Sequence, residues 1–316
     1  MPTITQLEYL IAVDKERHFG KAAKRCHVSQ PSLSAQIQKL EDELEVIIFD
    51  RSKKPIVVSE IGKEVVEQAK IIISEVKKIK SIATCGNLQA KGEFHLAVIP
   101  TIAPYLLPLF LARFSKANPK VNLKVSEEKT EDIIRLLADE EIDAGLLVTP
   151  LEDENLIEKH LFYEPFYCYI CKDHPFLNRK FVSEDDLTVE GLWLLEEGHC
   201  FRNQVLNICS PNRGKKVLPN VEFESGDLET LKNLIKRSSG YTLLPELAVN
   251  NMSAHEVKGH IRGFKKPIPT REISLVYSHN FYKDSILAAL EKTILETLPP
   301  QLRTQKRQSF EIIEIN

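Results

Sequence analysis

The sequence has little net charge, no secretory pattern at its start and no long uninterrupted apolar run. Its formal charge of −3 gives no overall positive field, so a nucleic-acid surface would need a local group of basic residues. The first residues lack a basic stretch followed by a long apolar one, which predicts a cytoplasmic protein. Residues 96–114 are apolar but are interrupted by prolines and Arg113, whereas a membrane helix needs roughly 20 mostly apolar residues. We therefore expect no membrane contact.

Internal repeats and low-complexity segments are also missing, and we expect neither a cofactor nor a bound metal. A chain of 316 residues is too long for one average domain, which predicts two or three modules. The six cysteines should be free thiols in a reducing compartment. A disulfide there would be transient and redox-sensing rather than structural.

Residues 1–58 have the pattern of three helices followed by a turn between apolar segments. The first amphipathic helix extends to Phe19, and a short second one covers residues 21–26. Ser29 is a suitable N-cap for the third helix, and Pro31 falls in its first turn, where its missing N–H costs nothing. Four residues share one buried face of that helix through their helical spacing: Leu33, Ile37, Leu40 and Leu44.

The opposite face of the third helix carries small and polar residues. A recognition helix in a DNA major groove needs short side chains for close approach and amide or hydroxyl groups for base edges. The turn that follows has basic residues, as a wing that touches phosphate would. A solvated surface helix is the alternative. The candidate DNA contacts are Gln30, Pro31, Ser34, Ala35 and Gln38 on the helix, and Arg51, Lys53 and Lys54 in the wing.

Residues 59–86 predict one long helix that links two domains. Its apolar positions alternate spacings of four and three, as in a coiled coil: Val65, Ala69, Ile72, Val76 and Ile79. Packing within the same chain is the alternative, but no second long heptad segment follows. We therefore expect pairing with a second copy of the chain, and two-fold symmetry suits paired DNA half-sites.

From residue 91 to 300, short apolar runs alternate with amphipathic helices, which predicts an α/β domain with a largely parallel sheet. We expect one subdomain at 91–164 with 269–300, a second at 165–268, and a tail at 301–316. Two such subdomains should enclose a ligand cleft near strand ends and helix N-termini.

Nearly the whole chain resembles the LysR-type transcriptional regulators. The segment FGKAAKRCHVSQPSLSAQIQKLEDELEVIIFDR carries this resemblance through many residue types at fixed spacings. It implies a winged helix-turn-helix, a linker helix and a periplasmic-binding-protein-like effector domain. It also implies binding to double-stranded promoter DNA as a homodimer or homotetramer, with RNA polymerase as a partner. DNA contacts would fall on Gln30, Pro31, Ser34 and Ala35, although many members have arginine at the last position.

Three further segments resemble the peroxide-sensing branch of that family: AVIPTIAPYLLP, EEGHCFRNQ followed by Cys209, and SGDLETL with TLLPELAV. This resemblance implies hydrogen peroxide as the trigger and glutaredoxin or thioredoxin as the reductant. It makes Cys200 peroxidatic and Cys209 resolving. It adds three residues around the thiol: Thr101, Thr130 and Arg271. From the residues alone, both threonines could be helix caps and Arg271 a surface charge.

The chemistry of Cys200 fits this role. A thiolate attacks peroxide, and a cysteine at a helix start beside His199 and Arg202 should have a lowered pKa. The resulting sulfenic acid can condense with a second thiol. Members of the peroxide-sensing branch commonly have aspartate where this chain has Asn203. The remaining cysteines are expected to be packing residues: Cys26, Cys85, Cys168 and Cys171.

If residues 200–209 are helical, the two Cα atoms lie roughly 13 Å apart, whereas a disulfide needs about 4.4 to 6.8 Å. Oxidation should therefore unwind the segment. Two alternatives remain open: a LysR-type regulator that binds a small metabolite or anion in its cleft, and a thiol peroxidase that uses the same cysteine pair in turnover. The helix-turn-helix pattern argues against the enzyme.

Overall fold

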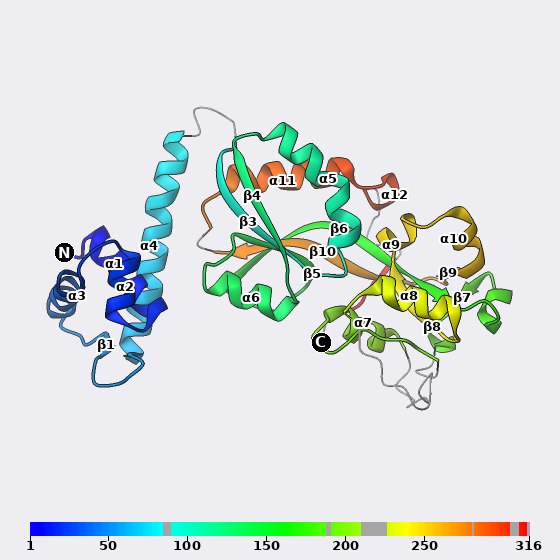
Figure 1. Cartoon of the computed structure of the whole chain (residues 1–316), viewed down its shortest axis with the longest axis horizontal. Helices are drawn as coiled ribbons and strands as arrows, with labels where there is room; N and C mark the ends of the chain where they lie inside the picture. Colours follow the sequence, from blue (N-terminus) through cyan, green and yellow to red (C-terminus); the bar gives the residue numbers. More distant parts are fainter. Residues whose placement is uncertain (85–89, 188–190, 210–225, 280, 304–309, 315–316) are drawn as a thin grey trace. The chain divides into compact units, whose positions relative to one another are not determined.

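The computed structural model describes residues 1–84, 90–187, 191–209, 226–279, 281–303 and 310–314. The chain divides into two compact units (Figure 1). One comprises Met1–Leu88 with Asn280–Asp284, and the other comprises Gln89–His279 with Ser285–Asn316. Cys85, the end of the expected linker and parts of the expected tail lie outside the described residues.

The first unit has four helices and a two-stranded sheet in its described part. Their bounds are α1 Ile4–Glu16, α2 Phe19–Arg25, α3 Gln30–Leu44, β1 Phe49–Asp50, β2 Val57–Val58 and α4 Glu60–Thr84. A capping box of Thr3 and Gln6 starts α1, and Arg17 in the left-handed region ends it. The expectation that the first helix extends to Phe19 is therefore wrong, because Phe19 begins α2.

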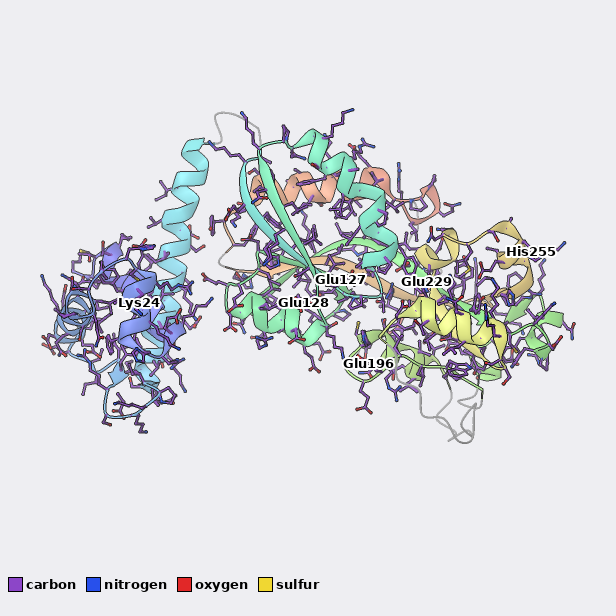
Figure 2. The ribbon with its side chains drawn as sticks, in the orientation of Figure 1. Lys24, Glu127, Glu128, Glu196, Glu229 and His255 are labelled. Atoms are coloured by element: carbon purple, nitrogen blue, oxygen red, sulfur yellow. The ribbon has the colours of Figure 1, made fainter. Side chains whose placement is uncertain are left out.

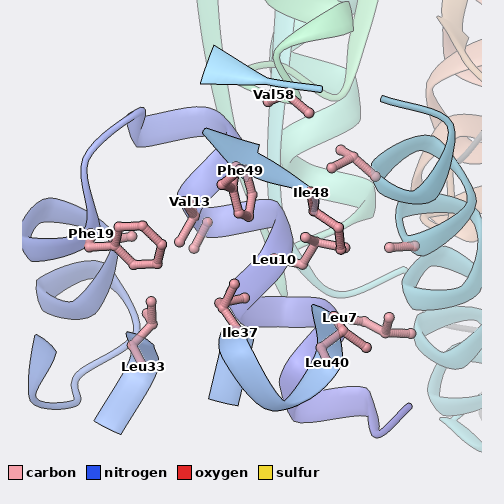
Figure 3. Packing of buried hydrophobic residues seen from close by; sticks show 14 of the residues in the cluster. Leu7, Leu10, Val13, Phe19, Leu33, Ile37, Leu40, Ile48, Phe49 and Val58 are labelled. Atoms are coloured by element: carbon pink, nitrogen blue, oxygen red, sulfur yellow. The ribbon is translucent and has the colours of Figure 1, made fainter. Parts of the chain in front are cut away.

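The apolar faces of α1, α2 and α3 meet β1 and β2 in one core (Figure 3). Leu33, Ile37 and Leu40 are fully buried, as the helical spacing predicts. Each such side chain contributes about 1.5 to 3 kcal/mol through removal from water. Leu44 is an exception with 36% exposure, because it is the last residue of α3 and the chain turns away at Glu45.

Helix α4 has one apolar face that packs on its own domain and a neighbouring apolar stripe that is exposed. Val66, Ala69 and Ile73 are buried in the core of the first unit. The predicted seam is therefore wrong at Ala69, since a helix turns 100° per residue and carries this position toward α1. Ile72 and Ile79 remain 38% and 66% exposed.

The second unit is a mixed α/β structure. Its strands are β3 Gly92–Val98, β4 Val121–Glu127, β5 Ala144–Thr149, β6 Leu156–Ile170, β7 Phe181–Val182, β8 Tyr241–Pro245, β9 Ile261–Phe264, β10 Ile268–Ser278 and β11 Phe310–Ile312. Its α-helices are α5 Ala103–Ala117, α6 Thr130–Ala138, α7 Cys200–Ile208, α8 Leu228–Arg237, α9 Glu246–Asn250, α10 Ala254–His260, α11 Asp284–Thr297 and α12 Pro300–Arg303. Two 3₁₀ turns cover Pro175–Asn178 and Glu184–Asp186.

The main sheet has the strand order β4-β3-β5-β10-β6-β9-β7, with β8 on β6 and β11 on β10. Strands β4, β3 and β5 are parallel, but β10 pairs antiparallel with both β5 and β6. The expected α/β fold class is thus confirmed, but the sheet is mixed rather than largely parallel, because β5, β6, β8, β9 and β10 make antiparallel pairs. The reason is that the long strands β6 and β10 run in opposite directions through the middle of the sheet.

Figure 1 shows α5 and α11 on one side of the first strands of this sheet and α6 on the other. Helices on both faces explain why β5 is buried along its whole length. None of the helices among the described residues has the length and apolar character that crossing a membrane requires.

Candidate functional site

The candidate recognition surface of the first unit starts at the N-terminus of α3. Ser29 caps the helix, its hydroxyl accepting the N–H of Ser32 at 3.3 Å, and Pro31 lies in the first turn as expected. The exposed candidates on α3 are Gln30, Pro31, Ala35 and Gln38, while Ser34 is half-buried. Polar, exposed side chains therefore lie at the positively polarised end of a capped helix.

The wing residues have two different environments. Arg51 donates to the buried carboxylate of Glu41 at 2.7 Å and to the Ser34 hydroxyl at 3.4 Å. Glu41 also accepts the backbone N–H groups of Ile48 and Phe49. Arg51 therefore joins the wing to α3, whereas Lys53 and Lys54 are exposed, with Lys53 Nζ 3.9 Å from the carboxylate of Asp50.

The centre of the second unit holds a fully buried ion pair between β10 and β6. Arg271 lies opposite Glu164 in the antiparallel ladder, with its Nε and Nη2 at 2.9 and 2.8 Å from Glu164 Oε2. Arg271 Nη1 donates to the Thr101 hydroxyl at 3.0 Å, and Glu164 Oε1 accepts the N–H of Leu247 at 2.8 Å. Both charges thus have partners away from water, which fixes the arginine.

Cys200 is the first residue of α7 and is buried, with 7% exposure. Burial raises the pKa of its thiol above the ordinary value. A hydrogen bond with Thr130, the charge of Arg271 and the N–H groups at the start of α7 act in the opposite direction. Beyond that contact with the thiol, the buried Thr130 hydroxyl has no hydrogen-bond partner among the described residues.

The expected lowering of the Cys200 pKa by His199 and Arg202 is therefore wrong. Burial and the nearby Lys129 lower the pKa of His199, so its imidazole favours the neutral form. Arg202 donates to the carbonyl of Leu195 at 2.8 Å. The cation that acts on the thiol is Arg271.

Two contacts join the elements around Cys200. Lys129, just before α6, donates to Glu196 at 2.8 Å, and Tyr105 on α5 donates to Glu229 on α8 at 2.9 Å. Figure 2 labels Glu196 in the loop before α7 and Glu229 on α8. Burial and Glu229 raise the pKa of Tyr105, which keeps it a hydrogen-bond donor. Lys129 therefore holds the start of α6 to the loop before Cys200, and Tyr105 holds α5 to α8.

Cys209 caps the other end of α7 and is buried. Burial raises the pKa of its thiol to about 12, while a hydrogen bond with Tyr241 acts against this rise. Residues 200–208 form a continuous α-helix, so the two Cα atoms are roughly 13 Å apart. Both cysteines are free thiols, and a disulfide needs about 4.4 to 6.8 Å between Cα atoms.

Helix α7 contacts strand β6 through a pair of aromatic rings. The rings of Phe201 and Phe166 are 5.6 Å apart between centroids, and Cys168 lies two positions further along β6. Cys168 and Cys171 are buried and Cys26 is half-buried, as packing residues are. Asn203, by contrast, is exposed on α7, away from the buried cluster.

Sequence reasoning missed Glu164, Lys129 and Gln204. Glu164 is a single acid in the apolar run LFYEPFYCYI, and an acid within a buried strand pattern signals a buried partner. Lys129 and Gln204 had no comparable signal. Among the described residues, no group of three or more His, Cys, Asp or Glu side chains could hold a metal ion.

Comparison with known proteins identifies the family of this chain. The family described as "Bacterial regulatory helix-turn-helix protein, lysR family" matches residues 4–63, and "LysR substrate binding domain" matches residues 88–299. A hydrogen peroxide-inducible genes activator from Dickeya chrysanthemi is 39% identical over 274 residues, covering 87% of this chain and 88% of its own. The Escherichia coli K12 protein named DNA-binding transcriptional dual regulator OxyR is 38% identical with the same coverage.

Solved structures give the same result. A full-length OxyR variant from Pseudomonas aeruginosa has a TM-score of 0.71 and 33% identity, covering 93% of this chain and 98% of its own. An H2O2-bound OxyR mutant from Corynebacterium glutamicum has a TM-score of 0.60 and 26% identity, covering 94% and 92%. The expected family is confirmed: this chain belongs to the LysR family of bacterial helix-turn-helix regulators, with relatives that include OxyR.

Proposed function

We propose that this protein is a peroxide-responsive regulator that binds promoter DNA and is switched by oxidation of Cys200 and a reversible Cys200–Cys209 disulfide. The carrying observation is the arrangement around α7. Cys200 starts the helix beside the otherwise unpartnered hydroxyl of Thr130 and near Arg271, and Cys209 ends it. The names of the peroxide-responsive relatives support the same assignment.

The proposed reaction proceeds in two balanced steps. The Cys200 sulfur attacks one peroxide oxygen, the O–O bond breaks, and the leaving hydroxide takes the thiol proton to form water. The sulfenic acid then condenses with the Cys209 thiol, which forms the S–S bond and releases a second water. Thr130 and Thr101 would orient the peroxide, and Arg271 would stabilise negative charge on sulfur as the proton leaves.

Geometry couples this chemistry to a change of shape. Because the helix holds the cysteines roughly 13 Å apart, α7 must unwind before the sulfurs can meet. A segment with two alternative structures is what a redox switch requires. Reduction by glutaredoxin or thioredoxin would restore two thiols and the helix.

The remaining assignments follow from the family. Residues 1–58 would bind DNA through Gln30, Ser34 and the wing lysines, and 59–86 would be the dimerisation linker. Residues 91–300 would be the sensing domain, with subdomains at 91–164 with 269–300 and at 165–268, and 301–316 would be the tail. The protein would act in the cytoplasm, as a homodimer or homotetramer that contacts RNA polymerase. It would regulate transcription rather than act as an enzyme.

An exposed stripe on α4 supports pairing of two copies. Ile61, Ile72 and Ile79 lie on one side of the helix and are each more than a third exposed. Val65 and Val76 flank this stripe and are half-buried. Apolar side chains at this spacing suit a helix from a second chain, which would remove them from water.

One sample treated with a small dose of peroxide tests the proposal. Thiol labelling and DNA footprinting should both change in wild type, and Cys200→Ser should show neither change. Cys209→Ser should form a sulfenic acid at Cys200 but change its footprint only weakly. If labelling and footprint of wild type stay unchanged, the metabolite-binding alternative becomes the better assignment.

A further inference from the structure

The segment 310–314 lies against the strand that carries Arg271. Strand β11 pairs in parallel with the start of β10, with Thr270 opposite Ile312. Ile313 continues the attachment, since its N–H donates to the carbonyl of Thr270 at 2.9 Å. Ile313 is also buried. The segment is therefore fixed to the strand position next to Arg271.

The same segment binds the helix that separates the two cysteines. Gln204 is fully buried, and its Nε2 donates to the carbonyl of Ile313 at 2.8 Å. One turn further along α7, Asn207 donates to the carbonyl of Glu314 at 3.2 Å. Both side chains come from the part of α7 that must unwind before Cys200 and Cys209 can meet.

The alignment of these two donors depends on the helical form of α7. Gln204 and Asn207 are three residues apart, so they share a face of a helix and point toward the same backbone segment. Unwinding α7 would break that alignment and leave the buried carbonyl of Ile313 without its donor, which costs free energy. Residues 310–314 therefore favour the helical form over any form in which the cysteines are close.

We propose that residues 310–314, together with Gln204, form a positioning element that holds α7 helical and slows closure of the disulfide after Cys200 has been oxidised. The inference rests on the proposed peroxide-sensing function and adds contacts that set the rate of its second step. Residues 310–314 lie beyond residue 299, where the match to the LysR substrate-binding domain ends. The element acts on the second step, because Gln204 lies a full turn along α7 from Cys200 and its side-chain amide donates to the carbonyl of Ile313.

Full-length variants separate the two steps. Gln204→Met removes the buried donor with little change in volume, and a chain ending at residue 309 removes residues 310–314 with both acceptor carbonyls. Glu314→Ala is the matched control, because Asn207 binds the backbone carbonyl of Glu314 and the exposed side chain is not needed. Melting temperatures of all variants report whether each one folds.

Two rates are measured after addition of hydrogen peroxide. Trapping with dimedone in a Cys209→Ser background gives the rate of sulfenic acid formation, which should change less than about two-fold in every variant. Quenched-flow alkylation and peptide mapping give the rate of Cys200–Cys209 closure. Closure should be roughly five-fold faster in Gln204→Met, as expected for one lost hydrogen bond, and faster still in the shortened chain. Glu314→Ala should close at the wild-type rate.

Unchanged or slower closure in a folded Gln204→Met protein would overturn the inference, whatever the shortened chain does. Acceleration by Glu314→Ala equal to that of Gln204→Met would also overturn it, since the effect would not depend on the donor. Failure of the proposed function is distinct: wild type itself would then form no sulfenic acid and no disulfide.

Discussion

Replacing Glu164 by glutamine should reduce stability and raise the reactivity of Cys200 at the same time. The substitution keeps an oxygen for the N–H of Leu247 but removes the charge that neutralises Arg271. An amide NH₂ would then face the guanidinium, donor against donor. Because the side chains of Arg271 and Glu164 are both 0% exposed, the buried guanidinium would be left without its counter-charge.

The expected magnitudes follow from this burial. Removing one partner of a buried ion pair costs about 3 to 5 kcal/mol. For a unit of this size, about 2 to 4 °C per kcal/mol gives a fall in apparent melting temperature of roughly 6 to 20 °C. The unbalanced charge of Arg271 should also stabilise the Cys200 thiolate more strongly, so the pKa of this thiol should fall.

Two assays follow the two effects. Differential scanning fluorimetry gives the melting temperature, and the rate of sulfenic acid formation as a function of pH gives the apparent pKa of Cys200. Arg135→Gln breaks an exposed pair with Asp132 and serves as control, with both quantities essentially unchanged. The double variant Glu164→Gln/Arg271→Met should recover much of the lost stability while the pKa of Cys200 rises. A melting temperature near that of wild type, or a raised pKa, in Glu164→Gln would refute this account of the pair.

Three further outcomes are expected. Gln30→Ala or Ser34→Ala should reduce discrimination between target and random DNA, whereas Lys53→Ala should weaken binding to both DNAs and flatten the salt dependence of binding. Equal losses of affinity for both DNAs in all three variants, measured in binding titrations, would remove the base-reading assignment. Ile72→Asp should lower the oligomer size because it places a charge in the exposed apolar stripe, and sedimentation with an unchanged oligomer would contradict the pairing. Burial raises the pKa of Cys209 from 9.0 to about 12, so the stability that this thiol contributes is complete below about pH 9 and is lost as pH rises toward 12. The midpoint of urea unfolding should therefore fall over this pH range, and it should fall less steeply in Cys209→Ala. Equal slopes in the two proteins would show that Cys209 is not responsible.

The sequence was most informative where local signals are sufficient. Ser29 and Pro31 mark the start of α3, and three of the four predicted core positions on that helix are buried. The predicted burial of Leu44 was wrong, because helical periodicity does not show where the surface that packs against the helix ends. The placement of Ala69 in the pairing seam was wrong for a related reason. The apolar face of α4 packs partly on its own domain, and the sequence does not show which apolar positions do so.

The environment of Cys200 depended on contacts that the sequence does not display. Neighbours in the chain, His199 and Arg202, suggested a lowered pKa, yet burial dominates and Arg202 points to a carbonyl. The acting cation, Arg271, comes from a strand 71 positions away, and its partner Glu164 comes from another strand. Electrostatics of a buried site depend on distances in space, which periodicity and spacing do not provide.

Hydrogen exchange across residues 199–209 tests the central claim most directly. Reduced wild type should protect the amides of α7, because each one from about the fourth residue onward donates within the helix. After peroxide treatment, with the Cys200–Cys209 disulfide verified by peptide mapping, the account predicts a marked loss of protection in this segment and none in peroxide-treated Cys200→Ser. Equal protection in reduced and verified oxidised wild type would contradict the unwinding of α7.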